Sequence, residues 1–491
     1  MMDTCDRGPA RRPRLSARGM IVVAAIAGCA GMATPLSGAT RSWVGGNSTW
    51  DNATAWDPAG QPQEGDQVLI GQNGATVTYA NPLDPRAIYP DLGIDAPGTN
   101  GATLSQAQST LNLNQFVIGG SGTGAMVHSG GAVNVLTGNV GLSVGSGPTG
   151  SGAYTLGASA ILTVTGQVTV GELGTGTFTQ TGGRMIVTPL GGFPGVLSIG
   201  ANTGSTGVYN LSGGTVESGS VQLSPFGGDA TFNHSAGAVV LPADLSLGDP
   251  TLPGLTGKAL YNHTGGAVSV QQLNIGSTGT FKQAGGTLRT NQLTIDLAGG
   301  RVDLTNQSMV VEYSGTTSAM ATIRTYLKGG YNGGAWDGSG IGSSVAGASG
   351  AVGAAEASEL LGISGTNTAQ WNGQTVDGTS VLLQYTLGGD ATLDGAVDFN
   401  DLVKLAQNYN TIGQMRWTTG DFNYDNNVDF ADLVLLAQNY NTALPPAGAV
   451  PGAGAAFEAD LARVVAGVPE PSTFSGAGVL ALFAWRRRRH G

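Results

Sequence analysis

The sequence predicts a mainly β protein: a right-handed parallel β-solenoid (β-helix) followed by a small α-helical module. Of its 491 residues, 83 are glycine, and only 11% are charged and 6% aromatic. This glycine excess favours a repeat architecture with many turns over a compact core. No Gly-X-Y period is present, which excludes collagen, and the 40% of hydrophobic residues exclude disorder over most of the length. Alternating segments such as 161–165, rich in β-branched residues, indicate strands.

One template recurs between residues 116 and 297. An aromatic or large apolar residue is followed, three to five positions later, by small residues and usually a Gly pair, and successive copies begin 20 to 31 residues apart. A unit of this size cannot bury its inward face alone, whereas stacked coils can. The Gly pairs suit tight corners that need a positive φ. The copies open at Met126, Tyr154, Phe178, Tyr209, Phe232, Tyr261 and Phe281, and strand-ending glycines precede them at Gly119, Gly145, Gly171, Gly200, Gly248 and Gly276.

The flanks of this repeat are predicted to close the solenoid. Residues 40–115 would form the N-terminal cap and first coils, and residues 298–389 the C-terminal cap region. The N-terminal flank contains Trp43, Trp50 and Trp56 and resembles the start of autotransporter-type and adhesin-type solenoids. These rings could stack on sugars, but a cap is the favoured interpretation, because an uncovered strand edge invites association.

The solenoid offers no catalytic constellation in its sequence. Glycoside hydrolysis needs two carboxylates at a controlled separation. The acids of residues 110–300 share no short motif; they are Glu172, Glu217, Asp229, Asp244, Asp249 and Asp296. His128, His234 and His263 each stand two positions after a template opening, which indicates a ladder of equivalent side chains and not a metal site. We therefore expect the protein not to be an enzyme.

The one motif with defined chemistry is a duplicated acidic loop. Residues 390–401 and 421–432 place oxygen donors at loop positions 1, 3, 5, 9 and 12, and a left-handed turn at position 6. Ca²⁺ takes roughly six to eight oxygen ligands, so carboxylates at alternate positions of a tight loop suit it. A near-identical segment with apolar residues at helical spacing follows each loop, at 399–410 and 430–441, and predicts two short helices. We expect two Ca²⁺ sites in this region.

This duplicated loop and helix resembles the EF-hand-like type I dockerin module, over residues 390–441. The resemblance implies backbone carbonyl ligands from Ala396 and Asn427. The side-chain ligands that it implies are Asp390, Thr392, Asp394, Asp398 and Asp401, then Asp421, Asn423, Asp425, Asp429 and Asp432.

Three departures from the dockerin pattern matter. Thr392 stands where Asn or Asp is usual, so the first site is expected to be the weaker one. Asn426 replaces Gly at the turn, which Asn tolerates. Positions 10 and 11, which often carry cohesin recognition in dockerins, are Phe399-Asn400 and Phe430-Ala431. Whether a cohesin-like partner binds is therefore an open question at the level of the sequence.

The N-terminus reads as an export signal. Residues 1–39 have the layout of a secretory signal peptide, with an Arg-rich stretch, the apolar run 20–33 and a small-residue cleavage site ending at Ala39. A lipobox-like string before Cys29 is the alternative, with lipidation of that cysteine, and Arg11-Arg12 also suggests a twin-arginine signal.

The body between the two ends is acidic. The chain has a formal charge of −11, but residues 40–485 hold 12 basic and 30 acidic residues. An acidic body repels nucleic acid, which is therefore excluded as a partner, and attracts cations.

The C-terminus resembles the PEP-CTERM sorting signal of exported bacterial proteins. Residues 468–491 combine Pro469-Glu470-Pro471, the apolar run 474–485 and the basic residues Arg486, Arg487, Arg488 and Arg489. The resemblance implies that a membrane exosortase recognises this segment and cleaves near Pro-Glu-Pro. As a helix, the apolar run would span about 18 Å, less than the ~30 Å of a hydrocarbon core, so membrane contact is expected to be transient. Residues 442–467, rich in Pro, Ala and Gly, are predicted to be a tether.

Together these features predict an exported, non-catalytic structural or adhesion protein of the cell surface, outer envelope or extracellular matrix. Its expected partner is an exosortase-type sorting enzyme, with an extracellular polysaccharide as a further candidate. The alternative is a dockerin-bearing protein that binds or degrades polysaccharide, as a glycoside hydrolase or lyase on a β-helix. Paired carboxylates facing one groove of the solenoid would favour that alternative.

Overall fold

The computed structural model describes residues 38–80, 84, 86–136, 141–249, 252, 254–413 and 416–444. Contacts divide the chain into two units, Met1–Ser37 and Gly38–Gly491, and the described residues all belong to the second. The predicted C-terminal sorting signal, nearly all of the signal peptide and most of the tether lie outside them. No helix within the described ranges is long and apolar enough to cross a membrane.

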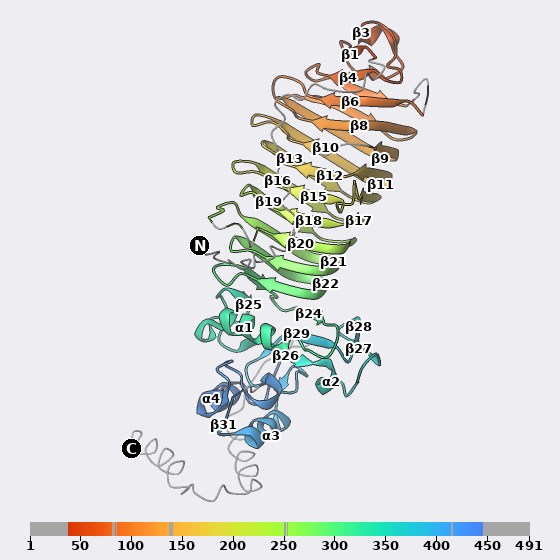
Figure 1. Ribbon diagram of the computed structural model, residues 1–491. Helices are drawn as coiled ribbons and strands as arrows, with labels where there is room; N and C mark the ends of the chain where they lie inside the picture. The colour runs from red at the N-terminus through yellow and green to blue at the C-terminus, as the bar shows by residue number, and fades with distance from the viewer. Residues whose placement is uncertain are drawn as a thin grey trace, which may run out of the picture. The chain divides into compact units, whose positions relative to one another are not determined.

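Stacked parallel coils form most of the second unit (Figure 1). Strands pair in parallel with the strands one coil further along the chain, and together they make a β-solenoid of about 11 turns. The mainly β class and the parallel β-solenoid predicted from the sequence are therefore confirmed.

The strands of the first half of the solenoid alternate with short turns. They are β1 (Thr40–Trp43), β2 (Ser48–Thr49), β3 (Trp56–Asp57), β4 (Gln67–Ile70), β5 (Thr76–Tyr79), β6 (Ile88–Ile94), β7 (Ala102–Gln106), β8 (Thr110–Ile118), β9 (Thr123–Val135), β10 (Leu142–Val144), β11 (Ser151–Thr165) and β12 (Gln167–Val170). A single turn of 3₁₀-helix, η1 (Ala53–Ala55), precedes β3.

The second half continues in the same way. Its strands are β13 (Thr175–Gln180), β14 (Arg184–Thr188), β15 (Val196–Ile199), β16 (Thr206–Leu211), β17 (Thr215–Ser218), β18 (Ser220–Leu223), β19 (Asp229–His234), β20 (Ala238–Leu247), β21 (Ala259–Ile275), β22 (Gly279–Ile295), β23 (Arg301–Asp303), β24 (Ser308–Glu312) and β25 (Gly340–Gly342). The parallel pairing extends through β23, β24 and β25, so solenoid strands continue beyond residue 297.

The predicted template openings lie opposite one another in successive coils. Tyr154 is in register with Phe178, which is in register with Tyr209, and the series continues through Phe232 and Tyr261 to Phe281. Their buried rings stack nearly parallel, with centroids 4.6 to 4.8 Å apart. This separation matches the spacing of hydrogen-bonded strands, so the repeat places one aromatic ring of each coil on the ring of the next.

The glycines of the template turn the chain as expected. The second Gly of each pair, from Gly131 to Gly286, has a φ between +64° and +86°, which an L side chain adopts only with strain. At Gly214 an added Cβ would also lie 2.3 Å from the carbonyl oxygen of Gly183 in the preceding coil. The pattern of strand-ending glycines missed β18, because Ser224, with φ +54°, follows this strand in place of Gly.

The three tryptophans of the N-terminal flank are interior residues. Trp43, Trp50 and Trp56 are at most 2% exposed, and Trp56 contacts the other two edge to face. Trp50 also packs on Tyr79 and Tyr89. These rings fill the first coils, as the cap interpretation predicts, and cannot form an exposed row that stacks on sugars.

An antiparallel sheet ends the stack at its C-terminal side. Strand β29 (Ser380–Leu387) pairs antiparallel with β24 and with β26 (Gly350–Glu356). Helix α1 (Met320–Tyr331) packs against β25 and β26. The short elements η2 (Asn332–Gly334), α2 (Ala357–Leu360), β27 (Thr368–Trp371) and β28 (Gln374–Asp377) complete this region.

Candidate functional site

The two acidic loops lie beyond β29, each followed by a helix (Figure 1). Helix α3 (Phe399–Asn408) follows loop 390–401, and α4 (Phe430–Asn439) follows loop 421–432. In the first loop, β30 (Ala396–Val397) pairs with β33 (Thr442–Ala443) after α4, and in the second, β32 (Asn427–Val428) pairs with β31 (Thr411–Ile412) after α3. The 3₁₀-helix η3 (Trp417–Thr419) precedes the second loop. Each half of the module thus contributes a strand to the other.

The carboxylate at position 1 of each loop accepts the same two backbone hydrogen bonds. Asp390 accepts at Oδ1 from the N–H of Asp394 (3.2 Å) and at Oδ2 from that of Gly395 (2.9 Å). Asp421 accepts correspondingly from the N–H groups of Asp425 and Asn426, both at 3.1 Å.

The carboxylate at position 12 is held in the same way in both loops. Asp401 accepts from the N–H groups of Thr392 (2.9 Å) and Asp398 (2.8 Å). Asp432 accepts from those of Asn423 (3.3 Å) and Asp429 (3.0 Å). The two loops are therefore structural as well as sequence repeats.

Capping fixes where each helix begins. Asp398 and Asp429, at position 9, are the N-caps of α3 and α4, and each forms a capping box with the position 12 aspartate. A side-chain acceptor at the N-cap satisfies backbone N–H groups that the first helical turn leaves free. The left-handed turn predicted at position 6 is present in both loops, with φ +87° at Gly395 and +74° at Asn426.

The loops bury negative charge. Asp390, Asp401, Asp421 and Asp432 are all 0% exposed. Burial raises the pKa of Asp401 and of Asp432 to about 6, although backbone hydrogen bonds act in the opposite direction. Burial also raises the pKa of Asp390 and of Asp421. A buried carboxylate without a cation is costly, so the loops have the electrostatic character of a cation site.

The donor set fits a hard divalent cation, although the side chains do not form a preassembled cage. The residues at the expected ligand positions offer carboxylate, hydroxyl, amide and backbone carbonyl oxygens, which suit Ca²⁺. Over the described ranges, no three or more His, Cys, Asp or Glu side chains converge closely enough to hold a metal ion. The loops therefore match a hard divalent cation in the chemistry of their donor atoms and in their buried charge, and not in a preformed ligand geometry.

The loops are joined to the end of the solenoid by specific contacts. The 3₁₀-helix η3, which holds Trp417, packs against β26, and the Tyr424 hydroxyl donates to the carbonyl oxygen of Val352 in β26 (2.7 Å). The indole N–H of Trp417 donates to the carbonyl oxygen of Asp390 in the first loop (2.5 Å). Arg324 of α1 forms an ion pair of 2.5 Å with Asp421. Arg324 carried no signal in the sequence, because it lies 97 positions before its partner.

The acids of the solenoid are engaged by neighbouring groups. Glu217 pairs with Arg184 at 2.8 Å. The other contacts come from a hydroxyl or a backbone N–H: Ser143 to Glu172, Ser246 to Asp244, Lys258 to Asp229 and Ala298 to Asp296. These positions have local structural roles.

The three histidines of the repeat face the solenoid interior. His128 and His234 bond the hydroxyls of Tyr154 and Tyr261 in the following coil, at 2.9 and 3.0 Å. His263 stacks on His234 with centroids 4.9 Å apart. Its ring nitrogens find no hydrogen-bond partner among the described residues, and the next coil presents Phe281, which has no hydroxyl. The ladder predicted from their shared template position is present.

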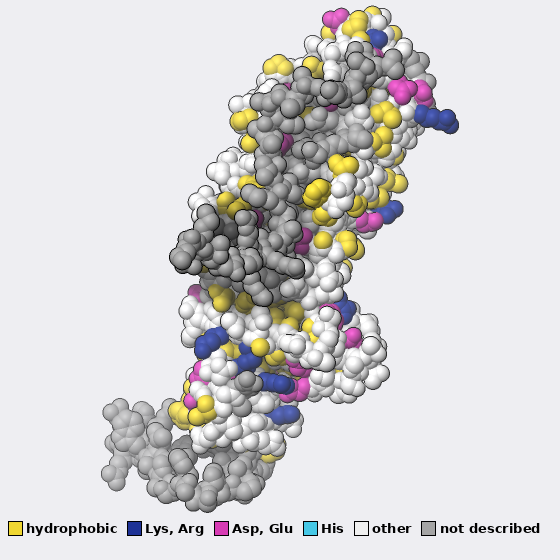
Figure 2. Space-filling view, in the orientation of Figure 1, with side chains coloured by type: hydrophobic (Ala, Val, Ile, Leu, Met, Phe, Trp, Pro, Cys, Tyr) yellow, Lys and Arg dark blue, Asp and Glu magenta, His cyan; other side chains and the backbone are white. Residues whose placement is uncertain are grey.

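Charge is unevenly distributed over the visible surface (Figure 2). Lys, Arg, Asp and Glu side chains gather over the region of α1 and the acidic loops, while the uncovered part of the solenoid in this view shows mostly hydrophobic side chains and white atoms, with scattered charged side chains. Phe399 and Phe430, both at loop position 10, are 39% and 60% exposed.

The structure thus defines a mainly β solenoid protein with a duplicated acidic loop. Residues 467–489 match the model of the PEP-CTERM protein-sorting motif, which confirms the resemblance read from the C-terminus. The motif indicates an exported surface protein that an exosortase sorts. No curated protein and no solved structure matches the chain.

Proposed function

We propose that this chain is a non-catalytic structural or adhesion protein of the cell surface or extracellular matrix, with two Ca²⁺ sites in a dockerin-like module. Its solenoid would act as the surface-exposed body. Calcium bound to loops 390–401 and 421–432 would neutralise their buried carboxylates and order the module at the end of the solenoid.

One observation carries the calcium part of this proposal. The two loops repeat the same hydrogen-bond pattern around two fully buried carboxylates each. A solvated acidic linker would keep these carboxylates exposed to water, because desolvation of a carboxylate without a counter-ion opposes folding. Ca²⁺ is the favoured cation, because every donor at the expected ligand positions is an oxygen.

The structural role of the solenoid is supported by the use of its residues. Its acids hold neighbouring strands and turns, and its interior is filled by stacked rings such as Phe178 and Tyr209. An assay of reducing-sugar release from a panel of polysaccharides tests the non-catalytic part. We expect no release, whereas sustained release by the purified chain would favour the degrading alternative.

Calcium binding is best tested on the full-length chain, because Tyr424 and Arg324 join the second loop to β26 and α1. After removal of metal with EDTA and dialysis, titration with CaCl₂ is followed by calorimetry and by near-ultraviolet circular dichroism. We expect a heat of binding and a change in the aromatic signal, since Trp417 donates to the backbone of the first loop.

The variants Asp401→Asn and Asp432→Asn each remove one buried carboxylate, and together they should abolish both signals. Asp296→Asn is the matched control, because Asp296 belongs to the solenoid and accepts from a local N–H. No response of the wild-type chain at millimolar Ca²⁺ would refute the calcium sites.

A further inference from the structure

The two acidic loops differ in the side-chain donors to their first carboxylate. Oδ2 of Asp390 accepts an additional hydrogen bond from the hydroxyl of Thr386, a neutral donor in β29. Oδ2 of Asp421 instead accepts from Nη2 of Arg324, at 2.5 Å. The Thr392 hydroxyl also donates to Oδ1 of Asp390, at 3.3 Å, while the backbone donors come from equivalent positions of each loop. The first carboxylate therefore has neutral side-chain donors in one loop and a cationic donor in the other.

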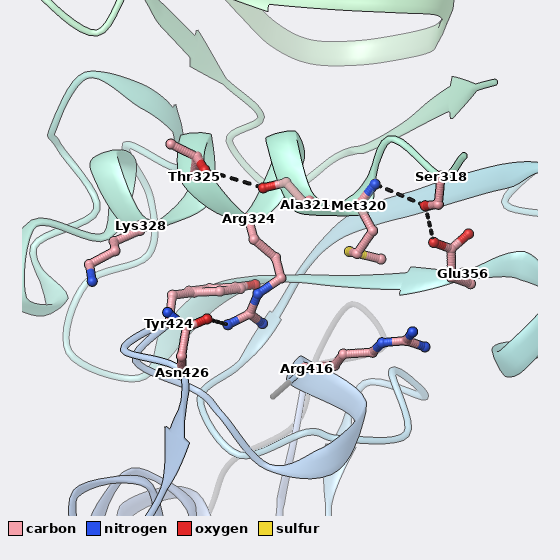
Figure 3. Close-up of a pocket in the computed structure, with 10 residues that line it drawn as sticks. All are labelled: Ser318, Met320, Ala321, Arg324, Thr325, Lys328, Glu356, Arg416, Tyr424 and Asn426. Carbon is pink, nitrogen blue, oxygen red and sulfur yellow. Dashed lines mark hydrogen bonds between the residues drawn. The ribbon is translucent and has the colours of Figure 1, made fainter. Parts of the chain in front are cut away.

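Arg324 is well placed to hold the second loop (Figure 3). Its side chain projects from α1 and is only 12% exposed. Besides Asp421, its guanidinium donates to Oδ1 of Asn426 at 3.0 Å and lies 5.4 Å from the centre of the Tyr424 ring. A single side chain thus contacts positions 1, 4 and 6 of the loop.

The contact lies at a pocket of about 360 Å³ between α1 and the second loop. Arg324, Lys328 and Arg416 all line this pocket. Arg416 pairs with Glu359, at 2.9 Å, and not with either loop. Of these three cations, Arg324 is the one for which the described part of the chain shows an ion pair with the second loop.

A guanidinium at this position opposes entry of a second cation. Asp421 already has a buried counter-ion, and breaking a buried ion pair by displacing one partner is strongly unfavourable. If Arg324 stayed in place, Ca²⁺ on the same carboxylate would meet its positive charge in an environment that screens poorly. Loop 390–401 carries no such cost, because the Thr386 hydroxyl is neutral.

We propose that Arg324 is an intramolecular competitor of Ca²⁺ at loop 421–432. Calcium then fills loop 390–401 first and enters the second loop only as Arg324 leaves Asp421. This inference rests on the proposed calcium function, and it reverses the order of affinity that Thr392 suggests from sequence alone.

The test is calorimetric titration of the full-length, metal-free chain with CaCl₂. Wild type should show two phases, of which Asp390→Asn removes the tighter and Asp421→Asn the weaker. Arg324→Gln should strengthen the weaker phase at least tenfold and leave the tighter phase unchanged. Arg416→Gln, which changes a pocket side chain that pairs with Glu359 and not with a loop, should alter neither phase.

Circular dichroism establishes whether each variant is folded. If Arg324→Gln is not, Arg324→Lys serves instead, because an ammonium cannot reproduce the planar fork of the guanidinium and should compete less well. A weaker phase that is unchanged or weakened in the folded variant overturns the inference. Absence of any calcium heat in wild type and variants would refute the calcium sites themselves, which is a distinguishable result.

Discussion

At the scale of single residues, the interior histidines occupy one repeat position but differ in whether the next coil offers their ring a hydrogen-bond partner. His128 and His234 bond a tyrosine hydroxyl of the next coil, while His263 faces Phe281 and has no such partner. Burial lowers the pKa of His128 and of His263 to about 4, because the charged imidazolium is poorly solvated inside the solenoid. These rings are therefore neutral in the folded protein at neutral pH.

This burial makes the stability of the solenoid depend on pH. The unfolded chain takes up a proton at each His below a pH of roughly 6.5, whereas the folded chain does so only near pH 4. Each such His therefore contributes stability that is lost as pH falls from about 6.5 to about 4, up to about 3 kcal/mol per residue.

The variant His263→Gln isolates this effect. Gln occupies the equivalent position at Gln106, Gln180 and Gln283, so it should fit the ladder. Urea unfolding at pH 7 and pH 4.5, followed by far-ultraviolet circular dichroism, should show a smaller loss of stability in the variant than in wild type. Ser269→Ala, on the exposed face of β21, should retain the wild-type loss, and an equal loss in His263→Gln would contradict the assignment.

At the scale of elements, the solenoid is organised by its column of stacked rings. The openings of the template predicted both the coils and their register, because an inward-facing aromatic residue marks the same point of each coil. The strand β18 was missed since Ser224 replaces the usual strand-ending Gly. The loops and the starts of α3 and α4 were predictable because their caps and ligand-like residues are local in sequence.

The contact of Arg324 with Asp421 was not predictable in this way. It depends on how α1 packs at the end of the solenoid, and local patterns carry no record of packing between segments far apart in the chain. The same applies to the bonds from Tyr424 to Val352 and from Trp417 to Asp390.

Removal of one ring from the column should destabilise the whole stack. Phe178 is 0% exposed and lies between Tyr154 and Tyr209, so Phe178→Ala should lower the free energy of unfolding by about 3–5 kcal/mol. Equilibrium unfolding in urea measures the loss. Phe193→Ala makes the same chemical change at a ring that is 65% exposed and should cost little, and comparable losses in the two variants would contradict the packing account.

At the scale of the whole molecule, the solenoid, the acidic loops and the sorting motif follow one another along the chain. The motif at residues 467–489 lies beyond the last described residue of the loop region. An exosortase acting there would separate the folded part from the basic C-terminus, and signal peptide cleavage would remove the basic N-terminus. The mature protein would then be the acidic body alone.

Mass spectrometry of both ends of the mature protein, recovered from the surface and extracellular fractions of a host with an exosortase, tests this account most directly. We predict a chain that begins after Ala39 and ends near Pro469-Glu470-Pro471, without Arg486 to Arg489. Replacement of Pro469, Glu470 and Pro471 by alanine should preserve the basic C-terminus. A wild-type chain that keeps both ends and remains in the cytoplasm would contradict the account.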